Sequence, residues 1–307
     1  MNQRDGGKDR FPLYGGIEGG GTKFICLVGS GPENIVAEAH FPTTTPEETL
    51  QRVCDFFAPY LDELRGIGLA SFGPLDLDPT SPTFGFITTT PKPHWAHINI
   101  LGILRQKLKI PIGIDTDVAA AAMGEFKWGA TQGLEPSLYL TVGTGIGGGL
   151  IIDGRPFRGL VNLEMGHIRI PHNLNLDPFH GACPYHEDCF EGLASGPAIQ
   201  ARFGKRAETL PDDHPFWQLE AEYIAHALAN YIFTIAPRKI VLGGGVMQRD
   251  FLYIKVRSRV QELLHGYLAH ETLTHHLETY IVPPALGKRS GALGGIALAM
   301  QAEAHAE

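Results

Sequence analysis

Residues 137–152 read SLYLTVGTGIGGGLII, which combines an apolar strand, a glycine-rich loop and a second apolar strand. The first strand is predicted to end at Val142 and the second to begin at Leu150, so that the loop covers GTGIGGG. The same order of elements is predicted near the N-terminus, where residues 14–28 read YGGIEGGGTKFICLV. Two such units in one chain indicate a duplicated architecture.

Strands and helices alternate along the rest of the chain, which is the pattern of an α/β protein. An amphipathic helix is predicted over Pro46–Leu64, where apolar residues recur at helical spacing. The acids of Asp115-Thr116-Asp117 stand at the start of an alanine-rich helix that runs to about Trp128. Further helices are predicted over residues 100–108, 198–203 and 216–233, and further strands over residues 66–71, 110–114 and 239–242.

The composition describes a globular protein whose 307 residues allow two domains, with 43% hydrophobic and 19% charged residues. The net charge is −8 and no basic run occurs, which argues against nucleic acid as a partner. No apolar stretch is long enough to span a bilayer, so no membrane association is expected. Residues 1–13 are polar, lack the apolar segment of a signal peptide and are expected to be flexible. Cys26 and Cys54 stand alone in apolar surroundings, which fits a reducing cytoplasm.

Three glycine clusters each follow an apolar strand, and such clusters let backbone amides approach phosphate oxygens. GGGTK lacks the spacer of a Walker A loop. GTGIGG has the GxGxxG spacing, but a strand follows it instead of a helix, which disfavours a nicotinamide oxidoreductase. A purely structural turn is the alternative for each cluster taken alone. The candidate phosphate-binding residues are Gly19, Gly20, Gly21, Thr22, Lys23, Gly143, Thr144, Gly145, Gly243, Gly244 and Gly245.

Asp117 has two interpretations. It follows an apolar strand at a predicted helix N-terminus, where the helix dipole favours the ionised carboxylate. Such a carboxylate can accept a proton from a substrate hydroxyl during phosphoryl transfer, so Asp117 is a candidate general base. The alternative is an ordinary N-cap, although Asp115 is the better candidate for that role.

A candidate metal centre lies in the segment Glu164–Glu191, which reads EMGHIRIPHNLNLDPFHGACPYHEDCFE. Cys183, His186 and Cys189 are each three residues apart, and thiolates with imidazoles are the ligands that tetrahedral Zn²⁺ selects. Spacing alone leaves His167, His180 and, more weakly, His172 open as the fourth ligand. Surface histidines with two reduced cysteines remain the alternative without a metal.

The motifs GIEGGGTK, DTDVAAAAMGE, TVGTGIGGG, EMGH, CPYHEDCFEG, SGPA and VLGGGVM, in this order, resemble the ROK family of sugar kinases and repressors. The resemblance extends from about Tyr14 to about Met300. CPYHEDC and the stretch PTSPTFGFITTTPKPHW are similar to bacterial ROK fructokinases in particular.

The resemblance implies an actin-like ATPase (ribonuclease H-like) fold, with two α/β domains around a cleft and a homodimer. The N-terminal domain would cover residues 14–117 and be completed by a C-terminal helix near residues 290–302. The second domain would cover residues 118–289 and include the zinc-binding segment 164–191.

The resemblance also implies ATP-dependent phosphorylation of a hexose, D-fructose to D-fructose 6-phosphate, with mannose, glucose or an N-acetylhexosamine as alternatives. The first glycine loop and the GTG loop would hold the ATP phosphates, and the third cluster would lie near the adenosine. Asp117 would be the base, and it would bind the sugar together with Glu164, His167 and Glu191. His167 would also complete a structural Zn²⁺ site with Cys183, His186 and Cys189, and Mg²⁺ would enter with ATP. A sugar-sensing repressor is disfavoured, because no DNA-binding segment precedes the first strand.

The chain departs from the common family pattern in three places. Glu18 stands where most members have aspartate, and the fructokinase branch resembles this chain at that position. Ala119 stands where many sugar kinases have asparagine. CPYHEDC replaces the usual CxCGxxGC zinc motif and exchanges one thiolate for an imidazole. Trp95 either lines the sugar pocket or packs in the core.

Overall fold

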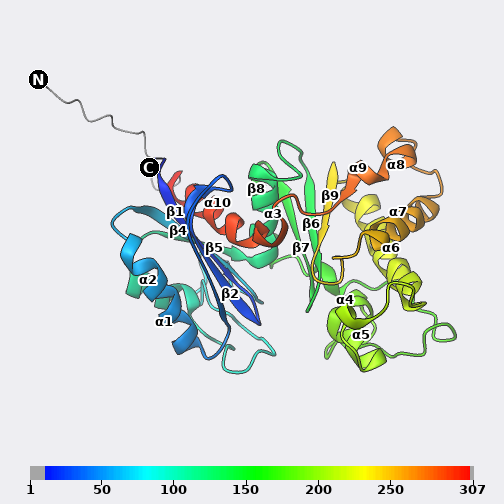
Figure 1. Ribbon diagram of the computed structural model, residues 1–307, viewed down its shortest axis with the longest axis horizontal. Coiled ribbons are helices and arrows are strands. Elements are labelled where there is room, and N and C mark those ends of the chain that lie inside the picture. Colours follow the sequence, from blue (N-terminus) through cyan, green and yellow to red (C-terminus); the bar gives the residue numbers. More distant parts are fainter. Residues whose placement is uncertain (1–10, 305–307) are drawn as a thin grey trace, which may run out of the picture. The chain divides into compact units, whose positions relative to one another are not determined.

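The computed structural model describes residues 11–304 and divides into two compact units (Figure 1). The first unit contains the residues up to Ala120 and those from Gly291 onward, and the second contains Ala121–Ser290. Segment 1–13 was expected to be flexible, and its residues 1–10 lie outside the described residues. β1 begins at Leu13.

The first unit is built on a five-stranded sheet in the order β3-β2-β1-β4-β5. β1 pairs antiparallel with β2 and parallel with β4, which in turn is parallel to β5. The strands are β1 (Leu13–Gly19), β2 (Lys23–Gly31), β3 (Asn34–Pro42), β4 (Leu64–Ser71) and β5 (Ile112–Thr116).

Helices cover both faces of this sheet. A Cβ at Gly15 would touch Phe57 of α1 (Pro46–Phe57), whereas one at Gly16 would strike the backbone of α10 (Ser290–Ala304). Because neighbouring residues of a strand point to opposite faces, α1 and α10 lie on opposite sides. α2 (Ile100–Leu108) joins α1 in the same hydrophobic core.

Two sequence predictions for this unit need correction. The helix predicted over Pro46–Leu64 ends at Phe57, because Pro59 follows in the short helix η1 (Ala58–Tyr60) and β4 begins at Leu64. No strand was predicted for β3. It lies at the sheet edge, and its half-exposed residues lack a clean apolar alternation.

The second unit repeats the arrangement of the first. Its sheet has the order β10-β9-β6-β7-β8, in which an antiparallel hairpin is again flanked by parallel strands on one side. The predicted duplication is therefore confirmed. The strands are β6 (Ser137–Val142), β7 (Ile146–Ile152), β8 (Arg155–Pro156), β9 (Lys239–Gly243) and β10 (Ile281–Val282).

The predicted glycine-rich loop of residues 143–149 is shorter than expected. β7 already begins at Ile146, so Gly147, Gly148 and Gly149 pair with β6. Glycine at position 148 leaves room for the Met165 side chain, because a Cβ there would force the Met165 sulfur atom to move.

Helices of very different length complete the second unit and its core. The long helix α6 buries many apolar residues against α4 and α7. The helices are α3 (Asp117–Trp128), which begins in the first unit, α4 (Phe190–Ala194), α5 (Gly196–Phe203), α6 (Phe216–Ile235), α7 (Asp250–Leu264), α8 (Glu271–His275) and α9 (Leu277–Tyr280), with the short helices η2 (Met165–His167), η3 (Ala207–Thr209) and η4 (Gly287–Arg289).

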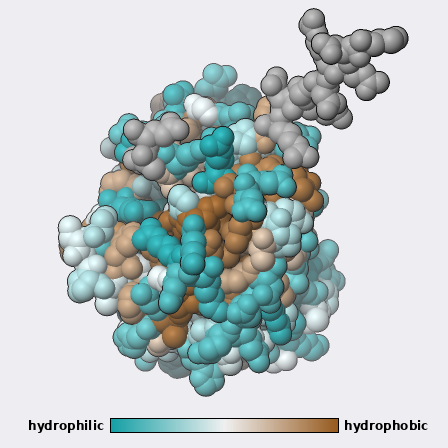
Figure 2. All heavy atoms as spheres, turned by 90° about the vertical axis from the view of Figure 1, so that its left-hand side faces the viewer, coloured by the Kyte–Doolittle hydropathy of each residue, from teal (hydrophilic) through white to brown (hydrophobic). Residues whose placement is uncertain are grey.

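The surface carries both polar and apolar regions. With the left-hand side of Figure 1 turned to the viewer, Figure 2 shows a hydrophobic area surrounded by hydrophilic side chains. An apolar area of this kind is a candidate contact surface. None of the helices within residues 11–304 has the length and apolar character of a membrane span.

Candidate active site and metal centre

In the first unit, two of the predicted site elements reach the same edge of the sheet. β1, β4 and β5 are parallel, and their last residues pair in register, with Gly19 beside Ser71 and Ser71 beside Thr116. The glycine turn after β1 and the Asp117 carboxylate after β5 therefore lie at one edge. The carboxyl ends of parallel strands are where α/β proteins bind ligands.

The glycine turn leaves backbone donors free. The Gly20 amide donates to the Lys23 carbonyl oxygen over 2.9 Å, which closes the turn between β1 and β2. The amides of Gly21 and Thr22 donate no hydrogen bond within the described part of the chain. Thr22 and Lys23 are also exposed. This turn can therefore offer amides, a hydroxyl and an ammonium group to an anion.

Asp117 is the half-buried first residue of α3. The capping bond of this helix comes from Thr116, whose hydroxyl accepts from the Ala119 amide over 3.2 Å. Asp115, the predicted cap, is only 1% exposed and accepts from the Thr116 amide, so that prediction was wrong. The helix end is capped without Asp117, although one Asp117 oxygen accepts from the Val118 amide.

Glu18 adds a second carboxylate to this edge. Its buried Oε2 atom meets no hydrogen-bond partner among residues 11–304. Burial, and then the charge of Asp117, raise the pKa of Glu18 to about 7, while Lys23 opposes the rise. A buried carboxylate that interacts with a second one suits a divalent cation such as Mg²⁺, which binds through one or two carboxylates and retains water.

In the second unit, the turn between β6 and β7 contains the predicted residues Gly143, Thr144 and Gly145. The Gly143 amide donates to the Gly145 carbonyl oxygen over 2.9 Å, and Thr144 is exposed at the tip. The Gly143 carbonyl accepts from the Gly196 amide at the start of α5 over 2.7 Å. The turn is thus held from the α5 side, with its tip exposed.

The third glycine cluster, Gly243–Gly245, begins with the last residue of β9 and lies beside this turn. β9 is parallel to β6, so both loops leave the same edge of the second sheet. Gly244 has a φ of 98°, and a Cβ there would strike the Val142 carbonyl. The Val246 amide donates to that carbonyl oxygen over 3.0 Å.

The three predicted sugar-binding residues of the second unit come together near the β6–β7 turn. Glu191 Oε2 accepts from the Ile146 amide over 2.8 Å. Burial raises the pKa of Glu164; His167 opposes this rise, and the charge of Glu191 adds to it. A set of two acids and an imidazole can accept and donate several hydrogen bonds to a polyol.

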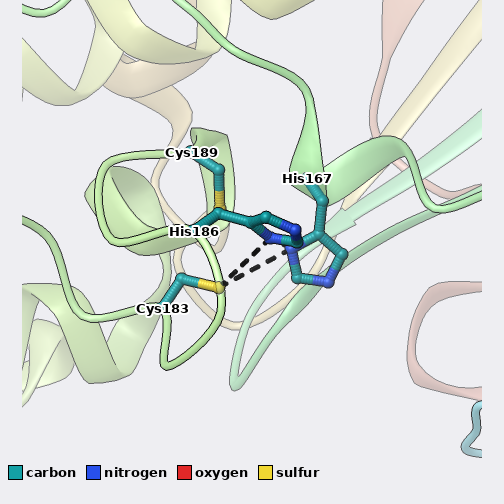
Figure 3. Close-up of side chains that lie close together, drawn as sticks. All are labelled: His167, Cys183, His186 and Cys189. Carbon is teal, nitrogen blue, oxygen red and sulfur yellow. Dashed lines mark hydrogen bonds between the residues drawn. The ribbon is translucent and has the colours of Figure 1, made fainter.

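The four predicted metal ligands form one compact cluster (Figure 3). Ligand atoms of His167, Cys183, His186 and Cys189 all lie within 4.8 Å of one another. The His167 Nδ1 atom lies 3.6 Å from Cys189 Sγ and 3.8 Å from Cys183 Sγ, and His186 Nδ1 lies 3.7 Å from Cys183 Sγ.

These distances fit a tetrahedral zinc ion. With Zn–S and Zn–N bonds of about 2.3 and 2.05 Å, tetrahedral geometry places a sulfur and a nitrogen ligand about 3.6 Å apart. Burial raises the pKa of the Cys189 thiol to about 11, so a coordinating cation is what would hold the sulfurs as thiolates. Donor type, number and spacing therefore all suit Zn²⁺.

The structure also separates the candidate fourth ligands. His167, and not His180, lies in the cluster. His172 faces other partners, since its Nε2 atom lies 3.1 Å from the Asp177 carbonyl oxygen and its Nδ1 atom 3.4 Å from Asp188. Its side chain is only 4% exposed.

Sequence reasoning missed Asp177, which holds the metal-bearing segment against two helices. Its carboxylate accepts from Tyr223 of α6 over 2.7 Å and from Arg202 of α5 over 2.9 Å. The Asp177–Pro178 dipeptide indicates a turn, and the Phe179 amide does donate to Asp177. Nothing in the sequence pairs this acid with Arg202.

Comparison with known proteins gives the family. The model of the ROK family matches residues 14–302. The chain belongs to the ROK family. It is 49% identical over 290 residues to a putative fructokinase of Bacillus subtilis, covering 94% of this chain and 96% of that protein. It is 44% identical over 300 residues to a fructokinase of Zymomonas mobilis, covering 95% of this chain and 97% of that protein.

A solved ROK structure supports the same assignment. The ROK hexokinase of Thermus thermophilus superimposes with a TM-score of 0.76 and 27% sequence identity, covering 96% of this chain and all of that one. The predicted ROK membership and α/β actin-like ATPase fold are therefore confirmed. Within this ROK protein, Trp95 is fully buried and stacks on Phe24, so the packing interpretation holds and the pocket one does not.

Proposed function

We propose that this ROK protein transfers the γ-phosphoryl group of ATP to D-fructose and forms D-fructose 6-phosphate and ADP. The observation that carries the proposal is the similarity to curated fructokinases along nearly the whole of both chains. The clustering of the candidate residues at the sheet edges of the two units supports it. Mannose, glucose and N-acetylhexosamines are the alternative acceptors.

In this proposal, Asp117 accepts the proton of the sugar 6-hydroxyl while that oxygen attacks the γ-phosphorus. The bond from this phosphorus to the oxygen it shares with the β-phosphate breaks, and ADP leaves. The Gly19–Lys23 and Gly143–Gly145 turns bind the phosphates through backbone amides, and Gly243–Gly245 lies near the adenosine. Glu18 and Asp117 are the residues that would hold Mg²⁺ carried in with ATP, and the ion would supply positive charge for the β- and γ-phosphates.

Glu164, His167 and Glu191 bind the sugar hydroxyls in this proposal. The Nδ1 atom of His167 faces the sulfur atoms of the cluster, so its Nε2 atom is left to bind a hydroxyl. His167, Cys183, His186 and Cys189 would hold zinc in a structural role, because four protein ligands leave no open position. Such an ion would fix the orientation of the His167 imidazole that binds the sugar.

The proposal includes a homodimer in the cytoplasm. The hydrophobic area in Figure 2 is the kind of surface that such a dimer uses, and light scattering of the purified protein tests the oligomeric state.

The test is a coupled ADP-release assay with ATP and Mg²⁺ across fructose, mannose, glucose and N-acetylhexosamines. We expect the highest kcat/KM with fructose, and a loss of roughly 10²- to 10⁴-fold in kcat for Asp117→Asn. A preference for another hexose would retain the mechanism and reject the substrate. Full activity of Asp117→Asn would reject Asp117 as the base.

A further inference from the structure

The residue after β3 contacts the first glycine turn twice. Thr43 is only 7% exposed, and β3 ends beside the start of β2, with Pro42 paired to Lys23. The Thr43 hydroxyl donates to the Gly20 carbonyl oxygen over 2.6 Å, and its amide donates to the Thr22 carbonyl oxygen over 3.0 Å. One residue therefore holds two carbonyl groups of the turn.

These two bonds determine where the amides of the turn point. In a trans peptide, the carbonyl oxygen and the N–H of the following residue lie in one plane and point in opposite directions across the C–N bond. The cis peptide bonds within residues 11–304 are Gly73–Pro74 and Glu135–Pro136, so the turn is entirely trans. Because the Gly20 carbonyl points to Thr43, the Gly21 amide points away from it, and the Lys23 amide is turned away in the same manner.

The neighbouring carbonyls are also bound within the protein. The Gly19 carbonyl accepts from the Phe72 amide over 2.7 Å, and the Lys23 carbonyl accepts from the Gly20 amide. Carbonyl oxygens repel phosphate, whereas amides bind it. The contacts of Thr43 thus keep two acceptors away from the side of the turn on which the Gly21 amide is offered.

Thr43 is itself held from the loop that follows β4. The Lys92 ammonium group donates to the Thr43 carbonyl oxygen over 3.3 Å. The indole N–H of the fully buried Trp95 donates to the Thr44 carbonyl oxygen over 2.8 Å. The Thr44 amide donates to the Thr49 hydroxyl oxygen over 3.0 Å, which ties the segment to α1.

We infer that Thr43 is a positioning residue for ATP, whose hydroxyl fixes the first phosphate turn with its amides directed toward the nucleotide. The inference rests on the proposed function, because it takes ATP as the ligand of this turn. It adds a residue that lies outside all three glycine clusters.

The test compares three variants. Thr43→Val keeps the side-chain shape and removes the hydroxyl, whereas Thr43→Ser retains the hydroxyl. Thr209→Val is the matched control, because it also removes a threonine hydroxyl that donates to a backbone carbonyl oxygen, that of Arg206 over 2.8 Å, but in the second unit and away from the turn. The Kd of a non-hydrolysable ATP analogue with Mg²⁺ is measured by calorimetry, and KM for ATP and for fructose by the ADP-release assay.

We expect Thr43→Val to weaken binding of the analogue and raise KM for ATP about tenfold, which is the effect of one lost hydrogen bond to a buried carbonyl. KM for fructose should stay within about twofold of the wild-type value in Thr43→Val. In Thr43→Ser and Thr209→Val, the Kd of the analogue and both KM values should stay within about twofold of wild type. Unchanged analogue binding in Thr43→Val, with only a lower unfolding temperature, would overturn the inference.

The two proposals fail in different ways. A wild-type protein that binds the analogue but phosphorylates no sugar would reject the proposed function, while analogue binding would still decide on Thr43. A wild-type protein that does not bind the analogue would reject both.

Discussion

Two buried glutamates of the second unit should respond very differently to the same substitution. Glu125 and Glu220 are both 0% exposed and lie in helices α3 and α6. The Glu125 carboxylate accepts four hydrogen bonds, of 2.8 to 3.1 Å, from the amides of Ala130, Ala285 and Leu286 and from the Ser290 hydroxyl. Both oxygens of Glu220 lack a hydrogen-bond partner in the described residues, and burial raises the pKa of this group well above its ordinary value.

The magnitude follows from these contacts. Glu125→Gln replaces one acceptor oxygen by an NH₂ group, which leaves at least one backbone donor facing another donor. It also removes the charge that strengthens the remaining bonds. With 1.5 to 3 kcal/mol for a hydrogen bond to a charged group, and a similar cost for an unsatisfied donor, the loss is about 3 kcal/mol. Glu220→Gln exchanges a carboxyl group that has no hydrogen-bond partner in the described residues for an amide of the same shape. Because burial already opposes the charge of this group, the cost stays below about 1 kcal/mol.

Urea unfolding of both variants, followed by circular dichroism with wild type in parallel, measures the difference. Ser290→Ala is an intermediate case, which removes one of the four donors and should cost about 1 kcal/mol. Equal destabilisation by Glu125→Gln and Glu220→Gln would refute the reasoning, because burial alone would then set the cost.

Three further predictions concern the metal centre, the phosphate edge and the aromatic core. The purified protein should contain one zinc ion per chain, as measured by mass spectrometry. Cys189→Ser should lose this ion and about 3 kcal/mol or more of unfolding free energy. His180→Ala should change neither the zinc content nor the stability, and loss of zinc from this variant would contradict the ligand set. The Glu18 carboxyl group keeps its proton up to about pH 7 in the folded protein, whereas it releases the proton near pH 4.5 in the unfolded chain. The free energy of unfolding of the nucleotide-free protein should therefore fall by roughly 3 kcal/mol as the pH rises through this range. Glu18→Gln should remove this part of the pH dependence of the unfolding free energy, measured by urea titrations at several pH values. If the slope of unfolding free energy against pH is the same in the variant and in wild type, Glu18 is not its source. Trp95→Ala should cost about 3 to 5 kcal/mol, since this buried ring packs on Phe24 and Phe72, whereas Trp95→Phe should leave KM for fructose unchanged in the kinase assay.

Features encoded by neighbouring residues could be predicted from the sequence. The strand–glycine–strand units were recognisable because turn residues and apolar runs are adjacent in the chain. The metal segment was recognisable because Cys183, His186 and Cys189 have regular spacing. The fourth ligand was ambiguous, since His167 is brought in by the Arg169–Cys189 bridge, a pairing that spacing does not reveal.

Features that depend on distant partners could not be predicted. Thr43 reads as an ordinary loop residue, and its role arises only because β3 ends beside the glycine turn. Glu125 lies 160 residues from Ala285, and no periodicity links the two. The strand β7 was shortened in the prediction because its three glycines suggest a loop, whereas pairing with β6 and contact with Met165 favour a strand.

The helix α10 has a consequence for the order in which the chain acquires its structure. It covers one face of the first sheet, where Gly16, Gly68 and Gly113 allow its backbone to approach the strands directly. All five strands of this sheet are synthesised before α10, which begins at Ser290. During synthesis the second unit can therefore close first, while one face of the first sheet stays uncovered until α10 has been made. A chain that stops short of residue 290 would retain the metal cluster and leave that face as a site for chaperones or aggregation.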